Sequence, residues 1–220
     1  MAGGELSDAV GSYRIEVIRK GIHLCSLSIP IIYFGIPKSL ALVVIIPVTA
    51  CFIGVDIARY YNRPVRDWFY RTFGWLLRPR ESDAGRKRLN GATYVVISAT
   101  LCILILPKLI AITSFSILII ADLTAALVGK RFGRHRFLGK TLEGSLAFFV
   151  SAVIVVLLTP KFEYRFEEYL VGTVAAGVGV IIEAAPIDID DNLSIPLCVG
   201  TAMWVFYHFA LPMIDVYKIG

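Results

Sequence analysis

The sequence predicts an all-α integral membrane protein with about seven transmembrane helices. Of its residues, 57% are hydrophobic and 18% are charged, and the mean hydropathy of +0.73 is well above that of soluble proteins. The apolar residues come in runs close to the roughly 17–25 residues of one bilayer crossing, and not in the short alternating stretches of a membrane barrel. Helices are therefore the expected spanning element.

The apolar runs define the expected transmembrane helices. Pro37-Lys38 alone separates the first two runs, and Pro107-Lys108 separates the third and fourth, so each pair is predicted to form a helical hairpin. We expect residues 1–220 to form a single membrane domain. The seven runs are 22–36, 39–58, 91–107, 109–128, 142–159, 169–185 and 193–214.

The distribution of Lys and Arg predicts the orientation of the helices. With a cytoplasmic N-terminus, 17 of the 22 Lys and Arg residues fall on the cytoplasmic side, as the positive-inside rule requires. The C-terminus is then outside. This topology accounts for the net charge of +5, so nucleic-acid binding is not expected. The predicted location is the cytoplasmic (inner) membrane, and the sequence is compatible with oligomers.

Two segments have the pattern of amphipathic helices at the membrane surface. In segment 1–21, apolar residues recur at helical spacing before the first span. In the basic cytoplasmic segment 59–90, an aromatic stripe lies among arginines, which fits contact with anionic headgroups. Alternatively, segment 59–90 only anchors the topology of the protein. The stripes are Leu6, Val10, Tyr13 and Val17, and Val65, Trp68, Phe69, Phe73 and Leu76.

Carboxylates within membrane-spanning segments indicate a structural or functional role, because inserting each one costs a few kcal/mol even on the scales that give the lowest penalties. Asp122 lies about two turns before the cytoplasmic end of its helix, and Glu143 and Glu183 lie at the cytoplasmic ends of theirs. Asp56 is expected to form a structural ion pair with Arg59. These acidic groups fall on one side of the membrane, although pairing of helix-end charges with loop arginines could explain any one of them.

The loop 129–141 has the composition of a phosphate-binding segment. Three glycines, Gly129, Gly133 and Gly139, allow close approach of an anion, and five cations include Lys130 and Lys140. The loop also runs into a helix whose first N–H groups would face the anion. The Walker spacing is absent, and an ordinary positive-inside loop is the alternative.

Acidic residues opposite a cationic loop suit a nucleotide with its Mg²⁺. Asp188, Asp190 and Asp191 lack any Lys or Arg in their own loop, and a metal ion could supply the missing positive charge. Close to the first span, Lys20 and His23 lie on one helix face together with Glu16 and Arg19. His23 could be a proton shuttle or a hydrogen-bonded interfacial anchor.

These stretches resemble a known family, the dolichol kinases, phytol kinases and CTP-dependent diacylglycerol kinases. The resemblance implies transfer of a phosphoryl group, commonly from CTP, to a lipid alcohol of polyprenol, phytol or diacylglycerol type. ATP remains open as the donor. The matching stretches are Arg19-Lys20 with His23, Arg88–Tyr94, Asp122–Gly133, Gly139–Ser145, Glu183 and Asp190–Leu197.

The resemblance also implies roles for individual residues. Asp122 with Asp190 or Asp191 would bind Mg²⁺, Lys130 and Lys140 would bracket the donor phosphates, and Glu183 or Asp122 would accept the hydroxyl proton. The expected catalytic residues are Asp122, Lys140, Glu143, Glu183 and His23. The expected nucleotide-binding residues are Arg19, Lys20, Gly129, Lys130, Gly133, Gly139, Lys140, Thr141 and Asn192.

Two other functions fit parts of the sequence. Phosphatidate cytidylyltransferases share the Asp, Gly, Lys-Thr and Glu-Gly core, but the chain is short for that family and ends in a plain span after Asp190-Asp191-Asn192. A transporter should place its charges near the bilayer midplane and is often built from repeated halves. Here the charges gather at one end and no internal repeat stands out, so a lipid kinase is the preferred interpretation.

Overall fold

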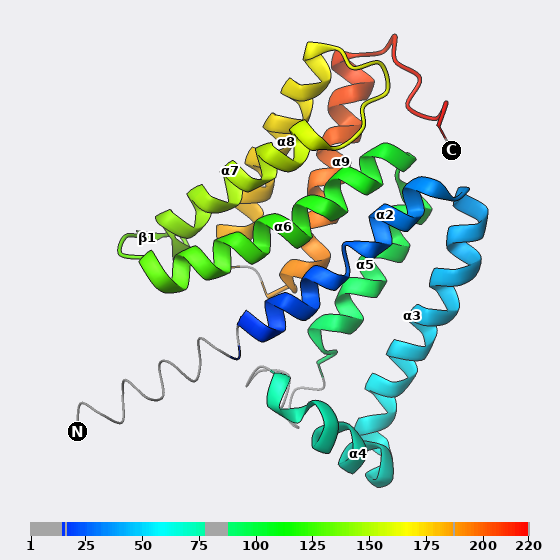
Figure 1. Ribbon diagram of the computed structural model, residues 1–220, viewed down its shortest axis with the longest axis vertical. Helices are drawn as coiled ribbons and strands as arrows, with labels where there is room; N and C mark the ends of the chain where they lie inside the picture. Colours follow the sequence, from blue (N-terminus) through cyan, green and yellow to red (C-terminus); the bar gives the residue numbers. More distant parts are fainter. Residues whose placement is uncertain (1–14, 16, 78–87, 187, 220) are drawn as a thin grey trace.

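A computed structural model describes residues 15, 17–77, 88–186 and 188–219 of the chain. A helix over 17–25 leads into α2, and together they make an apolar segment, Val17–Gly35. Figure 1 shows how the following helices pack into a bundle. The elements are α2 (Ser28–Gly35), α3 (Lys38–Tyr61), α4 (Arg63–Phe73), the 3₁₀ helix η1 (Gly74–Leu76), α5 (Gly91–Ile105), α6 (Lys108–Phe132), β1 (Arg136–Phe137), β2 (Lys140–Thr141), α7 (Leu142–Leu158), α8 (Phe166–Ala184) and α9 (Asp191–Ala210).

Every apolar run of the sequence forms a helix, which confirms the mostly helical membrane architecture. Four segments are long and apolar enough to cross a bilayer, namely Val17–Gly35, α3, α6 and α9. Helices α5 and α7 are apolar but shorter. Seven crossings and a cytoplasmic N-terminus therefore stay predictions. The two-stranded β1–β2 hairpin departs from the predicted all-α fold.

Helix α6 is the centre of the bundle. It packs against α7, α9 and α2, and most of its residues between Leu109 and Asp122 are buried. Gly200 of α9 gives the close approach that this packing needs, since a Cβ there would lie 3.0 Å from the Ser114 Oγ of α6. Because lipid supplies little hydrophobic driving force between helices, such close contacts hold the bundle together.

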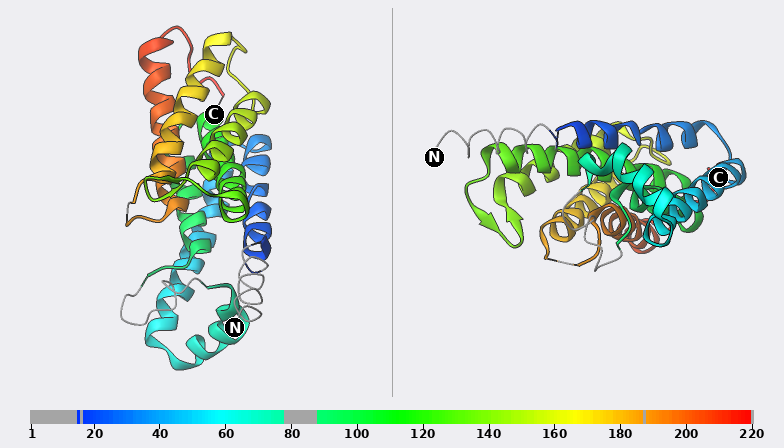
Figure 2. Two further views of the ribbon diagram at one scale, coloured as in Figure 1. Left: turned by 90° about the vertical axis from the view of Figure 1, so that its left-hand side faces the viewer. Right: turned by 90° about the horizontal axis from the view of Figure 1, so that it is seen from below.

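The connections of the bundle divide between its two ends. Figures 1 and 2 show the β-hairpin, α4 and the α8–α9 connection toward one end, and the α2–α3, α5–α6 and α7–α8 connections toward the other. The first end carries Arg63, Arg66 and Arg71 of α4 and Arg136 and Lys140 of the hairpin. Which side of the membrane this end faces stays a prediction. Most of the predicted amphipathic segment 1–21, and residues 78–87 of the basic segment, lie outside the described residues.

Helix α4 and η1 form over the predicted aromatic stripe, and their position at the membrane surface stays a prediction. The N-cap of α4 is Asn62, whose Oδ1 accepts from the Val65 N–H (3.3 Å). Phe69 is buried beneath the Arg59 guanidinium, 4.7 Å from the ring centroid. Trp68 stays 53% exposed, as a residue at the membrane interface would. Binding of anionic headgroups by this helix stays a prediction.

The predicted ion pair between Asp56 and Arg59 is confirmed. Arg59 Nε lies 2.8 Å from Asp56 Oδ1, and both side chains are fully buried. The second Asp56 oxygen accepts from the Asn90 N–H at 2.6 Å, and Arg59 Nη2 donates to the Arg88 carbonyl at 2.8 Å. The pair therefore ties the end of α3 to the residues that begin α5.

The orientation can be tested by labelling single cysteines in intact cells. In a variant whose four native cysteines are replaced by Ala, a cysteine at Tyr164, which is 66% exposed between α7 and α8, is expected to react with a membrane-impermeant thiol reagent. A cysteine at Arg134 is expected to react only after the cells are opened. The opposite pattern would contradict the predicted topology.

Candidate active site

The first part of the site is an ion pair between two transmembrane helices. The Lys20 ammonium contacts Asp122 Oδ2 of α6, and the two side chains are 5% and 10% exposed. An isolated charge at this depth is costly, so each group stabilises the other. His23 lies one turn after Lys20, and its charge, when protonated, also acts favourably on Asp122.

The second part of the site surrounds Lys140 on strand β2. Its Nζ donates to Glu183 Oε1 at the end of α8 (3.1 Å) and to Asp191 Oδ2 at the start of α9 (3.0 Å). Burial lowers the pKa of Lys140, but the two carboxylates outweigh burial and hold this pKa above its ordinary value. Lys140 is therefore fully protonated at neutral pH. Ser145 Oγ donates to the other Glu183 oxygen at 3.4 Å.

A tight hairpin positions Lys140. In its antiparallel register, Phe137 pairs with Lys140, and Leu138 in the turn has a φ of 51°. The Gly139 N–H donates to the Ala184 carbonyl (2.8 Å), which fixes the hairpin to the end of α8. Any side chain at Gly139 would crowd that carbonyl, with the Cβ only 3.1 Å from the oxygen. Glycine is required at position 139 because the backbone lies close to the end of α8, and not because its φ is positive.

The two parts form one charged cluster. Lys140 lies near enough to Asp122 for a favourable electrostatic interaction, and the negative charges of Asp122 and Glu183 also act on each other. Lys20, Asp122, Lys140, Glu183 and Asp191 therefore gather at the cytoplasmic ends predicted for their helices. This grouping matches the convergence expected from the sequence.

The predicted loop 129–141 differs from the loop expected. Helix α6 continues to Phe132, so Gly129 and Lys130 lie in its last turn. Close packing against Thr141 explains the extension, since a Cβ at Gly129 would lie 2.9 Å from Thr141 Oγ1 and a Cβ at Gly133 would lie 2.7 Å from Thr141 Cγ2. Thr141 itself is the N-cap of α7. These glycines thus have a packing role that requires no anion.

The start of α7 also differs from the expected anion site. The Leu142 N–H donates to the His135 carbonyl (2.9 Å), and the Gly144 N–H donates to Thr141 Oγ1 (3.3 Å). Both N–H groups are therefore satisfied within the protein. The positive charge at this point comes from Lys140 more than from free N–H groups of the helix.

Two carboxylates of the 188–191 segment pair with cations from other parts of the chain, so a metal ion is not their only source of positive charge. Arg88 Nη2 donates to both Asp188 oxygens at 2.8 and 2.9 Å, and Lys140 pairs with Asp191. The sequence places these partners about 50 and 100 residues away, so inspection of one loop could not reveal them. Asp190 is the N-cap of α9 and accepts from the Asn192 N–H (3.0 Å).

Four other predicted site residues, Glu143, Asn192, Lys130 and Arg19, take no part in the contacts described so far for this cluster. Glu143 Oε1 lies 2.8 Å from His135 Nδ1 on the loop before β1, where it stabilises the hairpin. Asn192 Nδ2 donates to Asp190 Oδ1 (2.8 Å) and reaches the Gly91 carbonyl at 3.5 Å. Lys130 is exposed in the last turn of α6, and Arg19 is half-buried beside Lys20.

The donor set around Lys140 is of the kind that binds a hard divalent cation. The carboxylates of Glu183 and Asp191 both contact the Lys140 ammonium group. Their charges therefore favour a cation at the position of that ammonium. Among the described residues, no three acidic, His or Cys side chains are already grouped as a complete metal site. Mg²⁺ commonly takes one or two protein carboxylates and completes its shell with phosphate and water. The residues present therefore fit that mode of binding.

Two residues that the sequence prediction left out of the site contact acidic residues that it named. Ser145 contacts Glu183, and Arg88 links the start of α5 to Asp188. Both lie inside stretches that carry the family resemblance, Gly139–Ser145 and Arg88–Tyr94. Their presence in those stretches was the available signal, although it could not give their partners.

Comparison with known proteins gives two matches along nearly the whole chain. The uncharacterised protein RP860 of Rickettsia prowazekii is 30% identical over 199 residues, covering 88% of this chain and 97% of that protein. The uncharacterised protein MJ1137 of Methanocaldococcus jannaschii is 30% identical over 193 residues, covering 84% of this chain and 91% of that protein. No family model matches the chain, and no solved structure matches it significantly.

Two further matches are to enzymes and cover less. The chain is 30% identical over 152 residues to the CTP-dependent diacylglycerol kinase 1 of Schizosaccharomyces pombe, which is 67% of this chain and 61% of the enzyme. It is 50% identical over 46 residues to the dolichol kinase of Saccharomyces cerevisiae, which is 20% of this chain and 9% of that enzyme. The chain belongs to the family of RP860 and MJ1137, and its partial similarity to these two kinases supports a relationship of that family to the membrane lipid kinases.

Proposed function

We propose that the chain is a membrane lipid kinase that transfers the terminal phosphate of a nucleotide, CTP in preference to ATP, to the hydroxyl of a lipid alcohol. The observation that carries this proposal is the position of Lys140 between Glu183 and Asp191, beside the Lys20–Asp122 pair. Paired lysines and carboxylates at one end of a membrane bundle suit a soluble phosphate donor and a lipid acceptor. The similarity to two lipid kinases supports the same reaction class.

Lys140 is the proposed contact to the transferred phosphoryl group. Its ammonium is held by two carboxylates in this structure, and it would exchange one of them for phosphate oxygens when nucleotide binds. A fixed positive charge at this point stabilises negative charge as it grows on the phosphoryl oxygens. Lys20 and Lys130 would attract the remaining phosphates.

One of two carboxylates would accept the proton of the lipid hydroxyl. Asp122 and Glu183 are both buried at the expected depth of a headgroup, 7% and 4% exposed. A base must come within hydrogen-bond reach of the hydroxyl, so the proposal requires the lipid headgroup to reach one of these two carboxylates. Asp191, with Asp122 or Glu183, would hold Mg²⁺, which when bound would neutralise charge on the donor phosphates.

The destination of a labelled phosphate tests this function. Purified protein would be incubated with γ-labelled CTP or ATP, Mg²⁺ and a panel of lipid alcohols that includes polyprenol, phytol and diacylglycerol. We expect label in a lipid monophosphate, with the nucleoside diphosphate as the other product. Release of labelled pyrophosphate in a parallel reaction that contains phosphatidate would instead identify a CDP-lipid synthase. Label that stays in the nucleotide with every alcohol would contradict the proposal.

The Lys140→Met variant is expected to lower kcat about a hundredfold, the scale known for loss of one transition-state donor, with a smaller rise in KM for nucleotide. Lys130→Met serves as the matched control, because Lys130 is exposed beside Arg131 in the last turn of α6. Its loss should mainly raise KM in a salt-dependent way. Steady-state kinetics with saturating lipid measure both. If Lys140→Met changed only KM, Lys140 would not stabilise the transition state, and the hairpin would act only as a cationic surface that attracts the nucleotide.

A further inference from the structure

We propose that α4 and the following helix η1 form a binding surface for anionic phospholipid headgroups, with the surrounding bilayer as the source of the lipid. Figures 1 and 2 show that α4 crosses the end of α3 instead of continuing along the bundle. Helix α3 has 24 residues, about 36 Å of helix, which exceeds the roughly 30 Å of the hydrocarbon core. Helix α4 begins two residues after α3 ends, so it would begin at the depth of the headgroups.

The charge of α4 complements an anionic surface. The helix contains one acidic residue, Asp67, against three arginines, and all four side chains are exposed. Arg66 lies 3.4 Å from Asp67, an exposed contact of the kind that contributes little. Within the described part of the chain, no carboxylate pairs with Arg63 or Arg71. These guanidinium groups can therefore bind lipid phosphate, which an arginine can contact through two N–H groups at once.

Aromatic side chains on the same surface are exposed beside these arginines. Trp68 and Trp75 are each 53% exposed, and Phe73 is 39% exposed. Arg71 follows Trp68 by three residues, which places the two side chains on one face of the helix. Arg66 precedes Phe73 by seven residues and shares a face with it in the same way. Exposed aromatic rings next to cations are typical of segments that lie between lipid and water.

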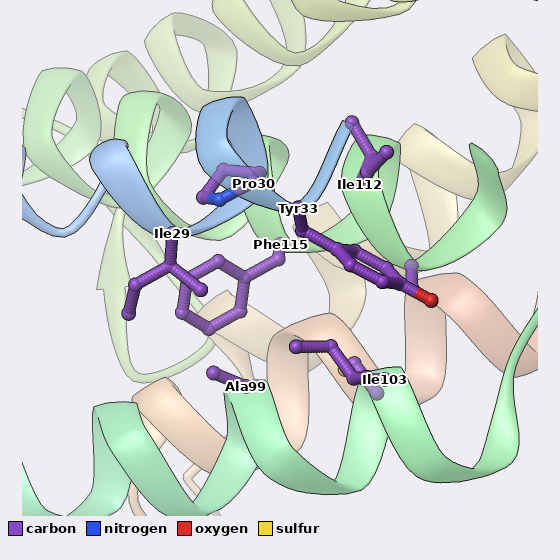
Figure 3. A pocket seen from close by; sticks show the side chains of 9 residues that line it. Ile29, Pro30, Tyr33, Ala99, Ile103, Ile112 and Phe115 are labelled. Carbon is purple, nitrogen blue, oxygen red and sulfur yellow. The ribbon is translucent and has the colours of Figure 1, made fainter. Parts of the chain in front are cut away.

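Exposure is not a property of every aromatic residue in the protein. Inside the bundle, Tyr33 and Phe115 line a small gap between α2, α5 and α6 and are only 2% and 3% exposed (Figure 3). Phe69 of α4 is buried as well, beneath the Arg59 guanidinium. Phe69 therefore fixes α4 to the end of α3, while the exposed rings stay available to lipid. A helix that is already held in place loses little conformational freedom when it binds.

Quenching of tryptophan fluorescence by brominated lipids tests this surface. In the Trp204→Phe variant the remaining tryptophans are Trp68 and Trp75, both on the proposed surface. The variant is reconstituted in mixtures of dioleoylphosphatidylcholine and dioleoylphosphatidylglycerol in which one lipid at a time is brominated. We expect the anionic lipid to bind beside these tryptophans about fivefold more tightly, the effect of one arginine near a charged surface. This preference should fall at high salt.

Two double variants that lose the same charge separate this surface from general attraction. Added to Trp204→Phe, the pair Arg66→Gln and Arg71→Gln should abolish the preference for anionic lipid. The pair Arg165→Gln and Lys218→Gln, which removes two exposed cations away from α4, should retain it.

Four results would overturn the proposal: no quenching by either lipid, equal binding of both lipids, a preference that high salt leaves unchanged, or the same preference in both double variants. The assay needs neither nucleotide nor catalysis. Failure of the proposed kinase function would therefore leave this result unaffected.

Discussion

Replacing Asp122 with Asn is expected to lower kcat about a thousandfold or more, the scale seen when a carboxylate of a catalytic group is lost. The substitution keeps the size of the side chain but removes its negative charge, and with it the ability to bind a metal or accept a proton. The Lys20 ammonium would also lose the counter-charge that it contacts in the structure. Some loss of stability should therefore accompany the loss of activity.

A double variant separates these two effects. Lys20→Met with Asp122→Asn removes both charges, so its resistance to thermal unfolding in detergent should return toward that of the native protein. Its kcat should stay as low as that of Asp122→Asn alone. Recovery of kcat in the double variant would make Asp122 a structural partner of Lys20 and remove it from the proposed site.

Replacing Asp56 with Asn should lower the free energy of unfolding by about 3–5 kcal/mol, because it leaves the fully buried Arg59 guanidinium without its counter-charge. The amide retains an oxygen that can accept from the Asn90 N–H, so charge is the main property lost. The Arg88–Asn90 stretch depends on this pair through two hydrogen bonds. Unfolding with a denaturing detergent measures the change.

Asp67→Asn is the matched control for Asp56→Asn. Asp67 also faces an arginine, Arg66 at 3.4 Å, but both side chains are at least half exposed. Exposed pairs contribute little, so its free energy of unfolding should change by less than about 1 kcal/mol. Equal losses in the two variants would mean that burial does not set the strength of the Asp56–Arg59 pair.

The sequence predicted the elements better than the contacts between them. Apolar runs located every long apolar helix, because lipid requires each spanning segment to satisfy its own backbone. The Asp56–Arg59 pair was also predictable, since both residues lie on one helix at a spacing of three. The gathering of Asp122, Lys140 and Glu183 followed from the positive-inside rule, which places their helix ends on one side without giving distances.

What the sequence could not predict depends on tertiary contact. The sequence suggested that Gly129 and Gly133 lie in a loop. In the structure α6 continues through Gly129, and both glycines pack closely against Thr141. The hairpin has a leucine at positive φ where glycine or asparagine is usual, so no turn signal marked it. The partners of Lys20 and Asp188 lie about 100 residues away in the sequence, beyond any local pattern.

The bond from Gly139 to the Ala184 carbonyl has a consequence for the thermodynamics of nucleotide binding. It places Lys140 and Glu183 on one rigid support, so the loss of conformational entropy that would otherwise accompany ordering of the hairpin occurs when the protein folds. Less of the interaction energy with the nucleotide is then spent on ordering the protein. The same bond makes the hairpin and the end of α8 a single unit, and exchange of the Gly139 amide hydrogen with solvent would report directly on its opening.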